Sequence, residues 1–184
     1  MVTPPFSIPS NWEWVNLGKI VDVARGGSPR PIEDYLTTDP NGYNWIKIGD
    51  VAPGDKFITK AAEKICPEGL SKTRYVEKGD FLLSNSMSFG RPYILKIDGC
   101  IHDGWLVLHP VPGTIDQDFL FYAMSSQLMY NLLQNAASGS TVKNLKSDTV
   151  KQLWFPLPPL CEQHRIALAV ELINNKIQSL IEAT

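Results

Sequence analysis

The sequence predicts an α+β fold, in which a compact, irregular mixed-sheet domain with packed helices is followed by a C-terminal α-helix of coiled-coil type. Three observations predict it. Short apolar runs bounded by Gly, Pro, Asp or Asn recur along the chain, an amphipathic helical pattern follows them, and a heptad pattern ends the sequence. At 184 residues with 43% hydrophobic content, the chain suits one globular domain plus an appendage.

Five short segments rich in β-branched or aromatic residues are predicted as strands. Turn residues separate them, which favours a compact and irregular sheet. The connection 26–44 contains three prolines and is longer than a minimal scaffold needs, and loops of that length are commonly functional. The predicted strands are Val21–Val23, Trp45–Ile48, Phe81–Leu83, Tyr93–Ile97 and Trp105–Leu108.

One helix with a buried face is predicted from Asp116 to Gln134. Its apolar residues recur mainly at i, i+4 spacing, which places them on one side of a helix. Core packing is a far commoner role for such a face than a cofactor site. The residues of the face are Leu120, Phe121, Met124, Leu128, Met129, Leu132 and Leu133.

The last segment, from Cys161 to Thr184, carries a different helical pattern. Its apolar residues are spaced alternately four and three apart, which keeps a narrow stripe facing a partner helix in a coiled coil. Only about two heptads are present, so the alternative is a terminal helix packed on its own domain. The residues predicted to pair with another helix are Ile166, Val170, Ile173, Ile177 and Leu180.

The chain shows no signal for export, membrane insertion or metal binding. It has no apolar run long enough to span a membrane, and Met1–Pro5 lacks a secretory pattern, so we expect a cytoplasmic protein. Cys66, Cys100 and Cys161 are an odd, widely spaced set without a C-x-x-C pair, which argues against a disulfide framework and a structural zinc site. We expect three single thiols and no bound metal.

Charge argues against a stand-alone nucleic-acid binder. The net charge is −2 and the pI is about 5.9, without the usual basic signature of that class. DNA binding would therefore need local basic clusters, or a complex whose other subunits neutralise part of the phosphate charge. Candidate clusters are Arg25 with Arg30, Lys72 with Arg74, Arg91, and Lys143 with Lys146.

Four phrases of the sequence together resemble a known family. They are Ile8–Gly18 with Ala24–Pro29, then Trp45–Val51, then Val76–Ser84, and finally Trp154–Ile166, which contains Pro-Leu-Pro-Pro-Leu-Cys-Glu-Gln-His-Arg-Ile. With these phrases the chain resembles the specificity subunit of type I DNA restriction and modification systems. In that family a target recognition domain runs into a long helical spacer. The resemblance covers nearly the whole chain.

The resemblance implies a division of the chain and a set of partners. Residues 1–157 would form the target recognition domain that binds double-stranded DNA, and residues 158–184 the start of a helical spacer or dimerisation segment. The modification methyltransferase subunits would bring S-adenosylmethionine and adenine methylation, and a restriction subunit would add ATP-driven cleavage, so this chain itself needs no cofactor. No membrane partner is implied.

Family members usually carry two recognition domains and two spacers, whereas this chain holds one of each. It is therefore interpreted as a half-subunit or as a fragment of a longer subunit. A homodimer formed through the C-terminal helix would read a symmetric, interrupted target, as two-fold symmetry requires.

Three polar loops are the candidate DNA contacts. In the first, two guanidinium groups flank a glycine turn and suit phosphate or guanine. The second is the preferred base-reading loop because it joins an amide suited to adenine with an arginine, and the third has a composition suited to the DNA backbone. For each loop alone, a solvated turn is the alternative. The predicted residues are Arg25, Ser28 and Arg30; Asn85, Ser86, Ser88 and Arg91; and Ser140, Thr141 and Lys143.

No catalytic motif is evident, so we predict that the chain is not an enzyme. A methyltransferase would need an Asn/Asp-Pro-Pro-aromatic tetrapeptide, but here Leu157 precedes the Pro-Pro pair and Leu160 follows it. Asp50, Asp55 and Lys56 come nearest to a magnesium nuclease set, yet loop carboxylates of this kind are most often turn formers. The adjacent pair His102–Asp103 is assigned an ordinary polar role.

Two other functions remain open. The first is a protein-interaction adaptor that uses the coiled-coil helix and binds protein through its loops, which the acidic pI mildly favours. The second is a recognition domain from a fused single-chain restriction and methylation enzyme, which is less favoured because no catalytic segment precedes the domain.

Overall fold

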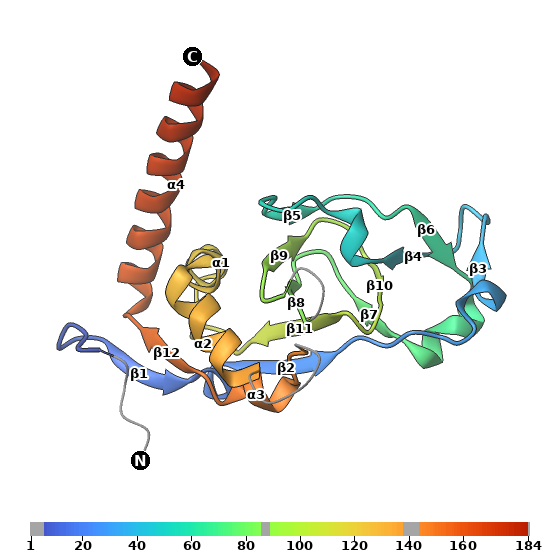
Figure 1. Ribbon diagram of the computed structural model, residues 1–184, viewed down its shortest axis with the longest axis horizontal. Coiled ribbons are helices and arrows are strands. Elements are labelled where there is room, and N and C mark those ends of the chain that lie inside the picture. The colour runs from blue at the N-terminus through green and yellow to red at the C-terminus, as the bar shows by residue number, and fades with distance from the viewer. Residues whose placement is uncertain (1–5, 86–88, 138–143, 184) are drawn as a thin grey trace.

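The computed structural model describes residues 6–85, 89–137 and 144–183. Its strands form two five-stranded sheets and one two-stranded sheet. Figure 1 shows the sheets beside a group of helices and one long projecting helix. The α+β prediction with mixed sheets and a long C-terminal helix is confirmed. The strands are β1 (Glu13–Asn16), β2 (Val21–Arg25), β3 (Leu36–Thr37), β4 (Tyr43–Ile46), β5 (Phe57–Ile58), β6 (Glu63–Ile65), β7 (Arg74–Val76), β8 (Phe81–Ser84), β9 (Pro92–Leu95), β10 (Gly99–Ile101), β11 (Trp105–Pro110) and β12 (Trp154–Leu157).

Helical segments lie between and after the strands. Four are short 3₁₀ turns: η1 (Leu17–Lys19), η2 (Ile32–Asp34), η3 (Ile48–Asp50) and η4 (Pro67–Lys72). The α-helices are α1 (Gln117–Ser125), α2 (Gln127–Ala137), α3 (Ser147–Lys151) and α4 (Leu160–Glu182). None of these described helices is long and apolar enough to cross a membrane.

The sheet β2-β11-β8-β9-β5 forms the middle layer of the domain. Along β11, Leu106 and Leu108 pack into the core that contains α1 and α2, while Trp105 and Val107 pack into a second core on the opposite side. All four side chains are fully buried. Burial on both faces explains why this strand is a continuous apolar run in the sequence instead of an alternating one.

The other five-stranded sheet, β3-β6-β4-β10-β7, closes the second core and is mixed, because β4 and β10 run parallel. Ile46 and Ile101 of this sheet are buried against Trp105 of the middle sheet. The indole nitrogen of Trp105 donates to the carbonyl of Ile46 at 3.2 Å. The two sheets are therefore held together by apolar packing and by a buried hydrogen bond.

The prediction of one continuous helix from Asp116 to Gln134 is wrong, because the structure breaks it at Ser126. This residue has extended dihedral angles, and its hydroxyl donates to Ala123 and accepts from the backbone of Met129. The break shifts the buried face, so that Met129 and Leu133 are buried whereas Leu128 and Leu132 are only half-buried. A serine can end one helix and cap the next, which a spacing pattern alone does not reveal.

The two ends of the domain meet in a small antiparallel sheet, in which β1 pairs with β12. Its register places Trp14 opposite Pro156 and Val15 opposite Phe155. Phe155 is fully buried and lies edge-on to Phe119, with ring centroids 6.0 Å apart. The Pro-rich exit is therefore an edge strand of the domain, a position that tolerates proline.

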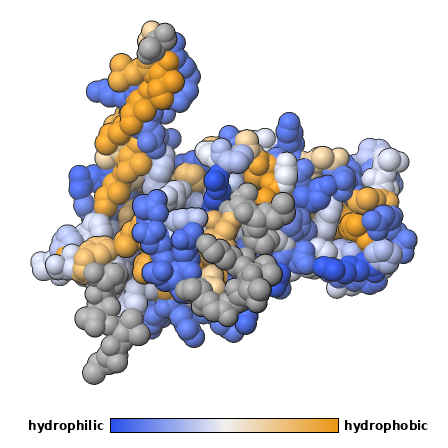
Figure 2. All heavy atoms as spheres, viewed as in Figure 1, coloured by the Kyte–Doolittle hydropathy of each residue, from blue (hydrophilic) through white to orange (hydrophobic). Residues whose placement is uncertain are grey.

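The root of α4 is fixed to the domain, whereas its distal part projects away from the sheets (Figure 1). Gln163 and Ala167 are buried at the root, but every residue from 171 to 183 is exposed. Figure 2 shows apolar side chains running along the projecting part. Among the predicted pairing residues, Ile166 and Val170 are half-buried, while Ile173, Ile177 and Leu180 are 57%, 50% and 70% exposed.

Candidate nucleic-acid interface

Asp103 lies at the centre of a polar cluster in the turn between β10 and β11. Ser28 donates from its hydroxyl to Oδ1 of Asp103 at 2.8 Å and accepts from the backbone nitrogen of Asp103 at 3.2 Å. Arg30 donates from Nη2 to Oδ2 at 3.1 Å. Both carboxylate oxygens are thus bound by side chains of the long connection 26–44.

The backbone carbonyl of Asp103 accepts two further hydrogen bonds. Arg25 donates from Nε at 3.0 Å, and Asn85 donates from Nδ2 at 2.8 Å. Four of the residues predicted from sequence, Arg25, Ser28, Arg30 and Asn85, therefore contact one residue for which the sequence indicated only an ordinary polar role. Sequence reasoning missed Asp103 as the centre of this cluster, and its position beside His102 was the only signal for it.

Two glycines allow the chain segments of the cluster to approach one another. A Cβ on Gly26 would lie 2.2 Å from the carbonyl oxygen of His102, and a Cβ on Gly27 would lie 2.7 Å from that of Lys72. No side chain fits at these distances, so glycine is required here. The approach also brings Nε of Arg74 to the carbonyl of Arg25, at 2.9 Å.

The cluster is exposed and carries more positive than negative charge. Its basic residues are Arg25, Arg30, Lys72 and Arg74, and all four are exposed. The side chain of Arg30 is 79% exposed and that of Asp103 is 42% exposed. An ion pair this exposed adds little to stability. Its effect is to hold the guanidinium and the carboxylate side by side at the surface.

Asp103 is ionised at neutral pH. Burial tends to raise its pKa, but the hydrogen bond from Ser28 and the positive charge of Arg30 are among the interactions that hold the pKa below the ordinary value of an aspartate. The carboxylate is therefore an acceptor only. Ser28, Arg30 and Asp103 also line a cavity of about 350 Å³ together with Pro29, Ile32, Trp45 and His102.

His102 supports this cavity as a neutral side chain. Burial is the largest effect on its imidazole and lowers its pKa below the ordinary value of 6.5. Its Nε2 lies 3.2 Å from the backbone nitrogen of Ile48, from which it accepts a hydrogen bond. The imidazole neighbours both Trp45 and Trp105, with ring centroids 6.2 Å and 6.4 Å away.

We expect His102 to make the domain less stable as the pH falls below about 6.5. Its pKa is lower in the folded than in the unfolded state, so the unfolded chain takes up this proton at a higher pH. The uptake lowers the free energy of the unfolded state relative to the folded state. Between pH 7 and 5, the free energy of unfolding measured with urea should fall more for the wild type than for His102→Gln. Equal slopes for the wild type and His102→Gln would contradict the assignment.

The family of the chain follows from a comparison with known proteins. The family described as "Type I restriction modification DNA specificity domain" matches residues 9–183. The chain belongs to this family. The match includes β1, the Asp103 cluster, β12 and all of α4, so the specificity domain comprises both the sheet domain and the projecting helix.

Curated relatives of this specificity domain are longer proteins. It is 28% identical to the type I restriction enzyme MjaIX specificity subunit of Methanocaldococcus jannaschii, over 94% of this chain and 40% of that protein. It is 26% identical to the EcoDI specificity subunit of Escherichia coli, over 90% of this chain and 35% of that protein. The chain thus spans less than half the length of these relatives.

Solved structures share the fold of the specificity domain. One is the HsdS subunit of Thermoanaerobacter tengcongensis, with a TM-score of 0.76 and 23% identity over 99% of this chain and 42% of that one. Another comes from a study of assembly and conformational transition of the type I R-M system, with a TM-score of 0.77 and 24% identity over 98% and 42%. At these identities the likeness shows the fold alone.

The second and third predicted loops of the specificity domain are described only in part. Asn85 is fully buried, so its amide supports the Asp103 turn from inside, and its Oδ1 has no hydrogen-bond partner among the described residues. Arg91 is exposed and lines a separate cavity. The remaining predicted residues, Ser86, Ser88, Ser140, Thr141 and Lys143, lie outside the described residues.

The thiols of the specificity domain are free, and burial raises the pKa of Cys100 to about 11. In the described part of the chain, no group of three or more His, Cys, Asp or Glu side chains is placed to hold a metal ion.

Proposed function

We propose that the chain recognises a short DNA half-site as the non-catalytic specificity component of a type I restriction and modification complex. Residues 1–157 act as the target recognition domain, and residues 158–184 act as the helical spacer. The observation that supports this proposal most strongly is the cluster at Asp103, where side chains from distant segments hold an exposed guanidinium beside an exposed carboxylate.

The pair Arg30–Asp103 is complementary to the major-groove edge of a G·C base pair. Guanine presents the acceptors O6 and N7 to an arginine, and cytosine presents an N4 amino donor to a carboxylate. Asp103 keeps acceptor capacity beyond its bonds to Ser28 and Arg30, since an ionised carboxylate offers about four lone-pair sites. Ser28 and Asn85 then serve as positioning residues.

The surrounding cations suit the DNA backbone. Arg25, Lys72 and Arg74 flank the reading pair, and phosphate contacts of this kind orient a protein on the duplex without selecting a sequence. In the proposal, Ser140, Thr141 and Lys143 add backbone contacts, and Ser86 and Ser88 lie next to the bases. The modification and restriction subunits supply the methylation and cleavage chemistry.

Arg30→Ala should relax the sequence preference at one G·C position. The test is selection from a random duplex library by the chain assembled with the modification subunits of its system. Loss of the bidentate contact should cost about 1–3 kcal/mol of discrimination at that position and leave the other positions unchanged. Asp103→Ala should weaken the preference at the same position.

Arg165→Ala is the matched control, because Arg165 is also an exposed arginine that forms an ion pair with a carboxylate, Glu162, but on α4. An unchanged motif in Arg30→Ala would refute the base-reading role of Arg30. Absence of any motif with the wild-type complex would refute DNA reading itself and favour the adaptor.

The salt dependence of DNA binding gives a second criterion. A DNA reader loses affinity steeply as the salt concentration rises, whereas an adaptor has little DNA affinity to lose.

A further inference from the structure

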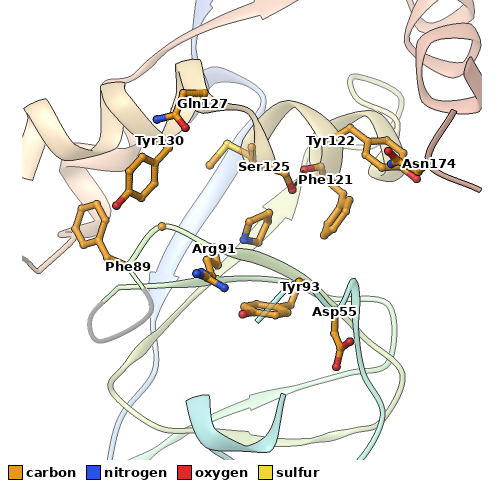
Figure 3. Close-up of a pocket in the computed structure, with 14 residues that line it drawn as sticks. Asp55, Phe89, Arg91, Tyr93, Phe121, Tyr122, Ser125, Gln127, Tyr130 and Asn174 are labelled. Atoms are coloured by element: carbon orange, nitrogen blue, oxygen red, sulfur yellow. Dashed lines mark hydrogen bonds between the residues drawn. The ribbon is translucent and has the colours of Figure 1, made fainter. Parts of the chain in front are cut away.

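A second cavity, of about 570 Å³, lies between the middle sheet and the helices and is separate from the Asp103 cluster. Figure 3 shows Arg91 and Tyr93 on the strand side, and Phe121, Tyr122 and Tyr130 on the helix side. Asp55, which precedes β5, and Asn174, which belongs to α4, also line the cavity. The volume falls within the range typical of small-molecule sites.

Arg91 gives this cavity a guanidinium that no ion pair of the described residues occupies, while Asp55 places one carboxylate on the same lining. Among the described lining residues it is the only cation, and no ion pair joins it to a carboxylate in the described parts of the chain. Its backbone is fixed to Ser84, which donates its N–H to the carbonyl of Arg91 at 3.0 Å and accepts from the Arg91 nitrogen at 3.0 Å through its hydroxyl. These bonds fix the backbone from which the side chain extends, and a guanidinium suits a phosphate or carboxylate.

Aromatic rings make up much of the remaining lining. Phe89, Tyr93, Phe121, Tyr122 and Tyr130 all contribute, and the rings of Phe121 and Tyr122 meet edge-on with centroids 5.4 Å apart. Burial raises the pKa of Tyr93, although the nearby Arg91 opposes this, so its hydroxyl remains a neutral donor. Aromatic rings beside an arginine are the combination that binds an unstacked base and its phosphate.

Two polar side chains on the helices can bind the edge of a base. The side-chain amides of Gln127 and Asn174 line the cavity and offer both donors and acceptors to the edge of a base. Asn174 belongs to the projecting helix, so an occupant would contact α4 as well as the sheet domain. A purely apolar ligand would leave the Arg91 guanidinium without an ion-pair partner, and a free phosphate would leave the aromatic rings without a contact.

We propose that this cavity binds a single unstacked nucleotide, with the phosphate on Arg91 and the base against the aromatic rings. Groove reading at Asp103 needs a paired base, so this site is distinct from the one proposed above. The nucleotide comes either from solution or from a DNA strand that releases it from the stack. Both sources present the same chemistry to the cavity.

The test uses the 5′-monophosphate of 2-aminopurine deoxyriboside, whose fluorescence is quenched when the base stacks on aromatic rings. Titration with the full chain should give saturable quenching. The nucleoside without phosphate should bind roughly tenfold more weakly or worse, because a charged hydrogen-bonded pair contributes about that factor. Arg91→Gln should show the same loss for the nucleotide, and Arg91→Lys should restore part of it.

Arg165→Gln, at an exposed arginine on α4, is the control and should bind as the wild type does. Tyr130→Leu should reduce the quenching while the chain stays folded, which its thermal unfolding will show. Competition with unlabelled duplex then separates the sources. Displacement of the probe by DNA identifies a strand nucleotide as the occupant, whereas a ternary complex of chain, probe and DNA identifies a free nucleotide.

Absence of saturable quenching, or quenching that is the same in Arg91→Gln as in the wild type, would overturn the nucleotide site. Because the titration contains no DNA, its result does not depend on whether the chain reads a DNA sequence.

Discussion

Gln163→Ala is expected to lower the free energy of unfolding by about 3–5 kcal/mol. The change leaves three backbone groups without their partner, and each buried polar group that loses its partner costs about 1–3 kcal/mol. The side chain of Gln163 forms three hydrogen bonds to the domain. Its Oε1 accepts from the backbone nitrogen of Asp116 at 2.7 Å, and its Nε2 donates to the carbonyls of Thr114 at 3.2 Å and Pro158 at 2.8 Å. Gln163 itself is 1% exposed, so little water reaches these groups.

Urea unfolding followed by circular dichroism measures this loss. Gln178→Ala is the matched control, because it removes the same side chain from the exposed part of the same helix, where Glu182 is the hydrogen-bond partner of Gln178 among the described residues. The control should change stability by less than about 0.5 kcal/mol. A loss in Gln163→Ala no larger than in Gln178→Ala would show that the three hydrogen bonds do not hold the root of α4.

The three hydrogen bonds of Gln163 also affect the proposed spacer function of α4. Asp116 is the N-cap of α1, since its Oδ1 accepts from the backbone nitrogen of Phe119 at 2.8 Å. Gln163 therefore connects the start of α1 to the root of α4 and helps to fix the direction in which α4 leaves the domain. If α4 is the spacer between two recognition domains, that direction sets their separation.

Replacing Ile173, Ile177 and Leu180 together by serine is expected to abolish association through α4. These side chains are 50% to 70% exposed and belong to the predicted heptad stripe. We infer that a second copy of this chain covers them by helix pairing. Sedimentation of the wild type should show concentration-dependent dimerisation, and the triple variant should remain monomeric with the same monomer stability.

Leu168 and Leu172 provide the control for this experiment. They are also exposed apolar residues of α4, at 48% and 66%. At 3.6 residues per turn they point more than about 100° away from the centre of the stripe. Serine at both positions should leave dimerisation intact. A wild type that stays monomeric at high concentration would refute the dimer, and loss of dimerisation only in the Leu168/Leu172 variant would place the interface on the other face.

Much of the fold could be predicted from the sequence because its signals are local. The apolar run at 105–108, the heptad spacing after Cys161 and the turn residues between strands indicate their elements without reference to the rest of the chain. The same applies to the family, whose phrases are contiguous in sequence. The two-residue strands β3 and β5 were not predicted, because their pairing partners, not their composition, define them.

The positions of the functional groups depend instead on contacts between distant residues. Asp103 became the centre of the candidate interface only when Ser28 and Arg30, more than seventy residues away, were found bonded to it. Asn85 was predicted to contact a base, but the structure shows that it is fully buried.

The fold class, the projecting helix and the family therefore follow from local patterns of side chains along the chain. Three further features became evident only in the folded molecule: the break at Ser126, the pairing of β1 with β12, and the hydrogen bonds of Gln163 to the domain. Each depends on which groups lie within hydrogen-bonding or packing distance after folding. Residue spacing along the chain does not encode that distance.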